Sequence, residues 1–287
     1  MDNKELYDQV CGDCSVLTTQ AYSTSFSIGI RFLGKPLRRP VYAVYGFVRF
    51  ADEIVDTFHG HDQSLLFEAF KKDTYNAIDQ KISLNPILQA FQQVYHRFNI
   101  DREHVDLFLQ SMEWDLNRNT YDRNGYDEYI VGSAEVVGLM CLRIFADGDQ
   151  EAYNRLLPSA RRLGAAFQKI NFLRDLREDY QEMGRTYFPG LDMKLFNEEA
   201  KVKIESEIDL DFRAAFEGVK RLPQTSRLGV YVAYTYYLKL FQKIQNLSSE
   251  RILTERIRIP NVQKIALLAR SYVRHSFNNI LPWRGAL

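Results

Sequence analysis

The spacing of apolar residues is the feature that most limits what this chain can fold into. Apolar side chains recur every three or four positions, as in the stripe of Leu228, Val232, Tyr236 and Leu240. No segment shows the period of two that a half-buried strand requires. Glycine, proline and asparagine interrupt the pattern near 34–36, 60–62, 85–86, 117–125, 147–149, 184–190 and 259–260. The pattern predicts an all-α fold, a bundle of long helices joined by short loops.

Length and charge narrow the classes of function. A chain of 287 residues, 46% of them hydrophobic, is long enough for one large core, and no low-complexity linker divides it. We therefore expect a single domain over 1–287. Lys and Arg together number 37, as do Asp and Glu. A net charge of zero provides no overall field to attract nucleic acid, so we expect no nucleic-acid partner and expect anions to be bound by local clusters.

The N-terminal region predicts a cytoplasmic protein. Cys11 and Cys14 form a C-x-x-C, but no second pair or nearby His completes a zinc site, so we interpret them as reduced cysteines. The first five residues are charged and precede no apolar stretch, unlike a signal peptide. No apolar run reaches the ~20 residues of a membrane span, and 41–48 comes nearest.

A polar stripe crosses an otherwise apolar segment at 40–56. Tyr45, Arg49, Asp52 and Asp56 are spaced four, three and four, which places them on one face of a helix. Two carboxylates one turn apart repel each other and are costly to bury. A divalent cation removes both problems, and Arg49 supplies a guanidinium for a phosphate oxygen.

A second stripe has the same chemistry. Gln168, Asn171, Asp175 and Asp179 are spaced three, four and four, and Arg174 flanks them. All the candidate ligands are oxygens, without His or Cys, which favours Mg²⁺ over zinc. A buried salt-bridge lattice, in which Arg49 and Arg174 neutralise the acids, is the structural alternative.

Three segments resemble the squalene/phytoene synthase family. Ser25, Phe26, Arg39 and the segments 42–49 and 51–56 resemble its first signature, with Glu53 as a mild variant. Tyr129 and 134–138 resemble its middle segment, except that Glu135 stands where the family usually has glycine, and we assign Glu135 no role. Residues 168–179 followed by 184–189 resemble the second signature closely.

The resemblance implies an all-α isoprenoid-synthase bundle around a central cavity, and an enzyme that joins two prenyl diphosphates head to head. The two stripes would face each other, with Mg²⁺ (or Mn²⁺) between the diphosphates and the metal ligands Asp52, Asp56, Asp175 and Asp179. Departure of pyrophosphate would leave an allylic cation, which the second prenyl double bond attacks to give a cyclopropylcarbinyl diphosphate. A second ionisation and rearrangement would give the linear product.

Residue roles follow from the same resemblance. The catalytic candidates are Tyr45, Arg49, Tyr129 and Arg174. The substrate-binding candidates are Phe26, Arg49, Val137, Gln168, Asn171, Arg174, Arg185 and Tyr237. A carbocation needs dry apolar walls, for which the candidates are Phe26, Phe47, Phe172, Val137 and Leu139. For Phe47, Phe172 and Leu139 we favour plain core packing.

Three functions stay open at this point. We favour synthesis of phytoene from two geranylgeranyl diphosphates, which needs no reductant. The first alternative is a squalene or dehydrosqualene synthase that uses farnesyl diphosphate, with NADPH required only for squalene. The second is a non-catalytic binding or assembly protein on the same fold, against which the intact acidic stripes argue. The insoluble product favours peripheral membrane contact, although no amphipathic basic helix marks it. The sequence indicates no oligomeric state.

Overall fold

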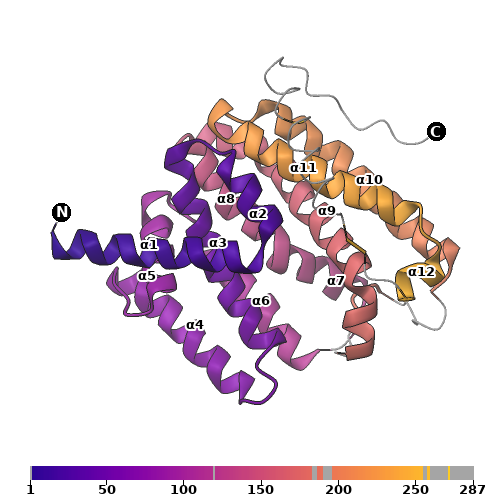
Figure 1. Ribbon diagram of the computed structural model, residues 1–287, viewed down its shortest axis with the longest axis horizontal. Helices are drawn as coiled ribbons and strands as arrows, with labels where there is room; N and C mark the ends of the chain where they lie inside the picture. Colours follow the sequence, from indigo (N-terminus) through magenta and orange to yellow (C-terminus); the bar gives the residue numbers. More distant parts are fainter. Residues whose placement is uncertain are drawn as a thin grey trace.

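Helices make up nearly all of the described chain (Figure 1). The computed structural model describes residues 2–118, 120–182, 186–189, 196–254, 257–258 and 271, and only the backbone of 179–182. The helices are α1 (Asn3–Tyr22), α2 (Thr24–Arg31), α3 (Lys35–Asp56), α4 (Gln63–Gln80), α5 (Pro86–Arg97), α6 (Arg102–Asn117), α7 (Arg123–Ile130), the π-helix η1 (Val131–Glu135), α8 (Val136–Ala146), α9 (Gln150–Glu182), α10 (Glu198–Arg221), α11 (Gln224–Gln245) and α12 (Ser249–Thr254). Within these ranges the β structure is a single bridge between Thr120 and Thr186, which confirms the all-α prediction.

The predicted breaks at 34–36, 60–62, 85–86 and 147–149 fall at helix ends. Asn85 shows why: its side chain accepts hydrogen bonds from the amides of Ile87 and Leu88, and Pro86 begins the helix. The sequence pattern did not predict the break at Ser23, because no glycine or proline lies there. There a serine caps α2 by accepting from the Phe26 amide at 3.2 Å. The predicted break at 259–260 and most of that at 184–190 lie outside the described residues.

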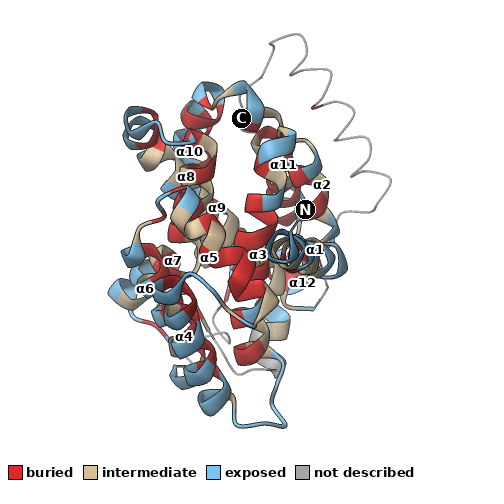
Figure 2. Cartoon of the chain, turned by 90° about the vertical axis from the view of Figure 1, so that its left-hand side faces the viewer, coloured by how far each residue is buried: buried red, intermediate tan, exposed pale blue. Residues whose placement is uncertain are grey.

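Three clusters of buried apolar residues form the core, two of them large and one small. The first joins α1, α3, α4, α5, α6 and α8, and at its centre Phe47 stacks on Phe91 with ring centroids 4.0 Å apart. The second joins α7, α9, α10, α11 and α12 around Phe212 and Phe241. Figure 2 shows the buried residues concentrated where helices such as α3 face the interior of the bundle. The single domain over 1–287 stays a prediction.

The stretch from Arg123 to Ala146 is the most apolar long segment in the described part. An 18-residue window within it has a mean hydropathy of 1.6, and by length and composition the segment is able to cross a membrane, which the sequence analysis did not predict. Half of that window is buried inside the protein. Its π-turn packs tightly: a Cβ on Gly132 would lie 2.5 Å from the Leu107 carbonyl of α6, so only glycine fits there. The segment is a core helix of the bundle here.

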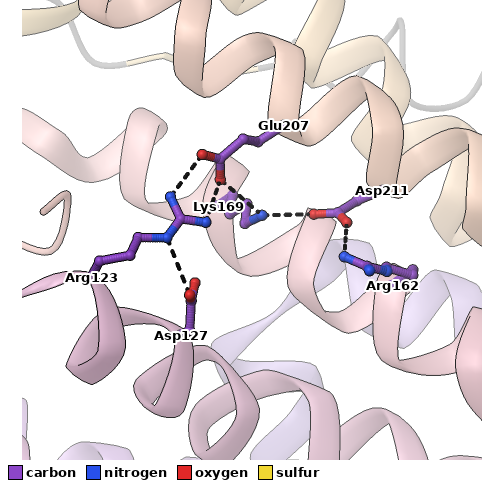
Figure 3. Close-up of polar contacts among 6 residues, drawn as sticks. All are labelled: Arg123, Asp127, Arg162, Lys169, Glu207 and Asp211. Atoms are coloured by element: carbon purple, nitrogen blue, oxygen red, sulfur yellow. Dashed lines mark hydrogen bonds and ion pairs between the residues drawn. The ribbon is translucent and has the colours of Figure 1, made fainter.

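Charged side chains hold the outer face of α9 against α7 and α10 (Figure 3). Lys169 donates to Asp211 at 2.8 Å and to Glu207 at 3.3 Å, and Arg162 also reaches Asp211, at 3.0 Å. Arg123 of α7 donates to Glu207 at 2.8 Å. The side chains of Lys169 and Asp211 are only 8% and 3% exposed. Lys169 directly follows Gln168, so this network fixes which face of α9 turns inward.

Asp211→Asn should lower the free energy of unfolding by about 3 kcal/mol, because it leaves the buried Lys169 ammonium short of a counter-charge. Urea unfolding followed by far-ultraviolet circular dichroism measures this loss. Glu199→Gln, which breaks the exposed Lys203–Glu199 pair on the same helix, is the control and should leave the transition midpoint unchanged. Equal effects of the two substitutions would show that the network does not anchor α9.

Candidate active site

One elongated cavity of about 550 Å³ lies between the two large core clusters. Its walls come from α2, α3 and α6 to α11, together with η1 and Tyr187. The lining residues on α9 run from Leu156 to Asp175, so the cavity follows that helix for about 28 Å. The floor lies at the start of α9, where Leu142, Leu156 and Leu222 belong to one small buried cluster.

The first acidic stripe lies on the cavity face of α3. Tyr45, Arg49, Asp52 and Asp56 all line the cavity, while other residues of this helix, such as Phe47, Ala51 and Val55, are buried in the core. Arg49 donates to Asp52 at 2.5 Å and also bonds Glu53. Burial alone would lower the pKa of Arg49, but the Asp52 and Glu53 carboxylates outweigh burial and raise that pKa. The stripe therefore carries a fixed cation among its acids.

One nitrogen of Arg49 is available to a ligand. The guanidinium lies 4.4 Å from the centroid of the Tyr22 ring, which stabilises its orientation. Its Nε atom is buried and makes no hydrogen bond to any residue that the structure describes. A buried donor without an acceptor is costly, and a diphosphate oxygen in the cavity would satisfy it.

The second stripe lines the same cavity from α9. Gln168, Asn171, Arg174 and Asp175 all face it, and Arg174 Nε donates to Asp175 at 2.8 Å. Burial alone would lower the pKa of Arg174, but the hydrogen bonds and charge of Asp175 outweigh burial and raise it. The Tyr237 hydroxyl donates to the side-chain oxygen of Asn171 at 3.3 Å, and burial raises the pKa of Tyr237 to about 12.

Aromatic rings bring the two stripes within reach of each other. The Phe26 ring lies 5.7 Å from the Tyr45 ring of the first stripe and 6.3 Å from the Tyr237 ring. Because Tyr237 contacts Asn171, the rings of Phe26 and Tyr237 connect Tyr45 of the first stripe to Asn171 of the second. Tyr129 and Val137 line the same cavity. The side chain of Asp179 and all of Arg185 lie outside the described residues, so their predicted roles stay predictions.

The oxygen donors on the two stripes suit a Mg²⁺ ion that binds together with a phosphate, rather than an ion held by protein ligands alone. Among the described side chains, no three of His, Cys, Asp and Glu gather closely enough to hold an ion. The carboxylates Asp52 and Asp175 are instead paired with arginines. Mg²⁺ in proteins commonly takes one or two carboxylates and completes its shell with substrate phosphates. The residues present therefore fit an ion that binds together with a diphosphate.

The structure corrects the predicted apolar walls. Phe172 lines the cavity, although we expected core packing for it. Phe47 and Leu139 do not belong to the cavity walls; each is buried in a core cluster, as we favoured for both. Each of these side chains is apolar on an amphipathic helix, and only tertiary packing decides which of them meets the cavity.

Sequence reasoning missed two groups of residues. The first is the small residues on the cavity walls, which are Gly29, Gly138, Gly164, Gly218, Gly229, Ala134, Ala160, Ala215 and Ala233. The second is Asp115 and Tyr187, which line the cavity and contact Tyr129 or each other. Glu135, to which we assigned no role, pairs with Arg161 at 2.5 Å and ties η1 to α9. Glycines within helices were a signal for the first group, because they cost helix stability unless packing requires them.

A match to the squalene/phytoene synthase family covers residues 19–263. The chain belongs to the squalene/phytoene synthase family. It is 26% identical to the phytoene synthase of Arthrospira platensis over an alignment of 288 positions, which covers 91% of this chain and 92% of that protein. It is 30% identical to the presqualene diphosphate synthase of Rhodopseudomonas palustris over 176 residues, 59% of this chain and 60% of that one.

The solved structures support the fold. A crystal structure of a dehydrosqualene synthase superposes with a TM-score of 0.81 at 23% identity, over 96% of this chain and all of that one. This confirms the isoprenoid-synthase fold. Members of the squalene/phytoene synthase family are prenyltransferases that join two prenyl diphosphates head to head. As a member of this family, the chain is a prenyltransferase of the same type. Family membership argues against the non-catalytic alternative.

Asp52→Asn should reduce activity about 100-fold or more, because loss of one such charge at the diphosphate site removes transition-state stabilisation. The unfolding free energy should change by no more than about 1 kcal/mol, because the partly exposed Arg49 keeps its contacts with Glu53 and Tyr22. Steady-state rates and urea unfolding measure the two effects.

Glu113→Gln is the matched control, because the Lys71–Glu113 pair has similar exposure and lies outside the cavity walls. It should leave activity intact. If Asp52→Asn instead destabilises the protein by about 3–5 kcal/mol and keeps its activity, the stripe is a structural salt-bridge lattice.

Proposed function

We propose that this enzyme condenses two geranylgeranyl diphosphates to phytoene, with Mg²⁺ and without a reductant. The observation that carries the proposal is a single cavity that both acidic stripes line and that continues along α9 as a long apolar lumen. Two diphosphate sites and one shared apolar space are what a head-to-head condensation requires.

Each stripe is suited to hold one diphosphate. In the first, Arg49 Nε is a buried donor, and Asp52 and Asp56 are the oxygen ligands. In the second, Arg174 and Asn171 donate and Asp175 is the ligand; Asp179 would extend this set. When bound, Mg²⁺ supplies the charge that neutralises departing pyrophosphate. The aromatic rings of Phe26, Tyr45 and Tyr237 exclude water beside the reacting carbons and present their faces to a cation.

The depth of the lumen supports the longer substrate. Beyond the stripes its walls carry glycine and alanine from α2, α8, α9, α10 and α11, which leave room for a prenyl tail. Ala160 lines the lumen about 22 Å along α9 from Asp175. The match to the Arthrospira phytoene synthase over nearly the full length supports the same substrate.

Farnesyl diphosphate is the alternative substrate. The 4,4'-diapophytoene synthase of Staphylococcus haemolyticus is 28% identical over 197 residues, 66% of this chain and 65% of that protein. On this alternative, NADPH would be needed only if the product were squalene.

A cytoplasmic location and peripheral membrane contact are part of the proposed function. Exposed apolar side chains support the membrane contact, such as Phe50 in α3, Phe58 just after it and Leu65 at the start of α4.

The product test uses each diphosphate separately, with and without Mg²⁺ and with and without NADPH. We expect phytoene from geranylgeranyl diphosphate, turnover that EDTA abolishes, and no change on adding NADPH. Mass spectrometry of the extracted hydrocarbon identifies the product. Turnover of farnesyl diphosphate alone, or squalene formation that requires NADPH, would contradict the proposed substrate.

A variant in the lumen tests the chain-length argument. Ala160→Leu should reduce the use of geranylgeranyl diphosphate more than that of farnesyl diphosphate, because the added carbons obstruct the tail of the longer chain. Asn154→Leu, on the exposed face of α9, is the control and should leave the ratio of the two rates unchanged. An unchanged ratio in Ala160→Leu would show that this part of the lumen does not determine the length of the substrate that the enzyme uses.

A further inference from the structure

Two turns of the chain, one between α2 and α3 and one between α10 and α11, lie against each other. The Gly34 amide of the first turn donates to the Thr225 carbonyl of the second at 2.6 Å. A Cβ on Gly34 would lie 3.3 Å from the Thr225 Cβ, so little space separates the two turns. In both views α2 and α11 lie side by side (Figure 1 and Figure 2). Side chains within a few residues of either turn therefore share one surface.

Five basic side chains surround this contact without acidic partners. Each lies within four residues of Gly34 or Thr225, and we call the five together the basic pole: Arg31, Lys35, Arg38, Arg221 and Arg227. None of them forms an ion pair with an acid in the part of the chain that the structure describes. Glu217, the acid next along the chain, is already paired with Lys220 at 2.7 Å. The basic pole therefore presents an uncompensated positive charge.

The chain as a whole is neutral, but its charges are separated along the sequence. Residues 14–51 and 218–249 together contain ten Lys and Arg and no Asp or Glu. The rest of the chain then holds 27 basic residues against 37 acidic ones. The two acid-free segments contain α2 and α11, which meet at the basic pole. A neutral protein thus has one positive end, whose field reaches about a Debye length into solution, ~10 Å at 0.1 M salt.

The same two turns close the floor of the cavity. Arg38 Nε donates to the Leu33 carbonyl at 2.8 Å, and Arg227 Nε donates to the Leu222 carbonyl at 2.9 Å. The side chains of Leu33 and Leu222 line the cavity and are buried. Each leucine therefore holds a cation with its backbone and walls the lumen with its side chain. The apolar lumen ends directly beneath the basic pole.

We propose that the basic pole binds the surface of an anionic lipid bilayer. The inference rests on the membrane contact that the proposed function includes, and names the surface that makes it. A bilayer fits because the lumen that holds a water-insoluble hydrocarbon ends at the same place as the positive charge. In this orientation the floor of the cavity faces lipid. The acidic stripes, at the other end of α3 and α9, face water, in which Mg²⁺ and pyrophosphate dissolve.

Exposed apolar side chains beyond the other end of α3 are a separate candidate contact. Phe58 is 37% exposed and follows α3, whose 22 residues place it about 33 Å from Lys35. Apolar side chains enter a bilayer whatever its charge, and salt does not weaken that contact. Contact through the basic pole depends on both lipid charge and salt. Lipid charge and salt therefore distinguish the two surfaces.

Sedimentation with vesicles of phosphatidylglycerol or of phosphatidylcholine, at low and high salt, tests the proposal. We expect binding to phosphatidylglycerol that salt reverses, and none to phosphatidylcholine. Each Lys or Arg near an anionic bilayer strengthens binding about fivefold, so Lys35→Gln combined with Arg221→Gln should weaken it about 25-fold. Neither residue lines the cavity, so turnover in detergent should equal that of the wild type and shows that the double variant is folded.

The matched control removes two exposed cations at α4, which lies at the opposite end of the molecule (Figure 1). Lys72→Gln combined with Lys81→Gln makes the same change in net charge and should bind as the wild type does. Brominated lipid tests the orientation, because it quenches tryptophan only at short range. It should quench the added fluorescence of Gln224→Trp, next to Thr225, and leave that of Asn76→Trp on α4 unchanged.

Three results would overturn the proposal. The first is an equal loss of binding in the two double variants. The second is binding to phosphatidylcholine that salt does not change, which assigns the contact to apolar side chains such as Phe58. The third is binding to heparin but to neither vesicle, which assigns the basic pole to a soluble polyanion.

The vesicle assay contains no substrate, so its result does not depend on which prenyl diphosphate the enzyme uses. A wild type that binds phosphatidylglycerol through another surface overturns the basic pole alone and leaves the membrane contact of the proposed function standing. A wild type that binds neither vesicle overturns both, while phytoene synthesis is still decided by the product test.

Discussion

The pairing of arginine with carboxylate on both stripes is the interaction on which this cavity depends. Asp52 and Asp175 point into a space that is otherwise largely apolar, where an unpaired carboxylate would be too costly to keep charged. Arg49 and Arg174 supply the opposite charge from the same helix in each case. The acids are thereby stable before substrate arrives, and the same arginines are placed to meet a diphosphate.

The position of α9 links the second stripe to the packing of the rest of the bundle. Its inner face carries the second stripe and the long lumen, and its outer face carries Lys169, which the α10 residues Glu207 and Asp211 hold. Gly164 allows the helix to approach the π-turn, since a Cβ there would lie 2.8 Å from the Ala134 carbonyl. Tyr129 lies two residues before that turn, so the packing that places α9 also places the tyrosine beside the cavity.

Sequence reasoning succeeded where one helix contains all the information. The spacing of Asp52 and Asp56, or of Asn171 and Asp175, is enough to put each pair on one face, and the structure places all four on the cavity wall. It failed where partners come from different elements. Asp115 is an acid near a helix end with no stripe around it in the sequence, and only the folded structure brings it to the cavity wall beside Tyr129 and Tyr187. Phe172 is an apolar residue like its neighbours until packing turns it toward the cavity.

The central claim is that the two stripes bind two diphosphates in one cavity with Mg²⁺. Isothermal titration of an unreactive prenyl thiodiphosphate in the presence of Mg²⁺ tests it most directly. The account predicts two ligands per chain for the wild type, one when Asp175→Asn removes the second stripe, and no tight binding in EDTA. A single ligand per wild-type chain, or two ligands that bind equally well without Mg²⁺, would contradict it.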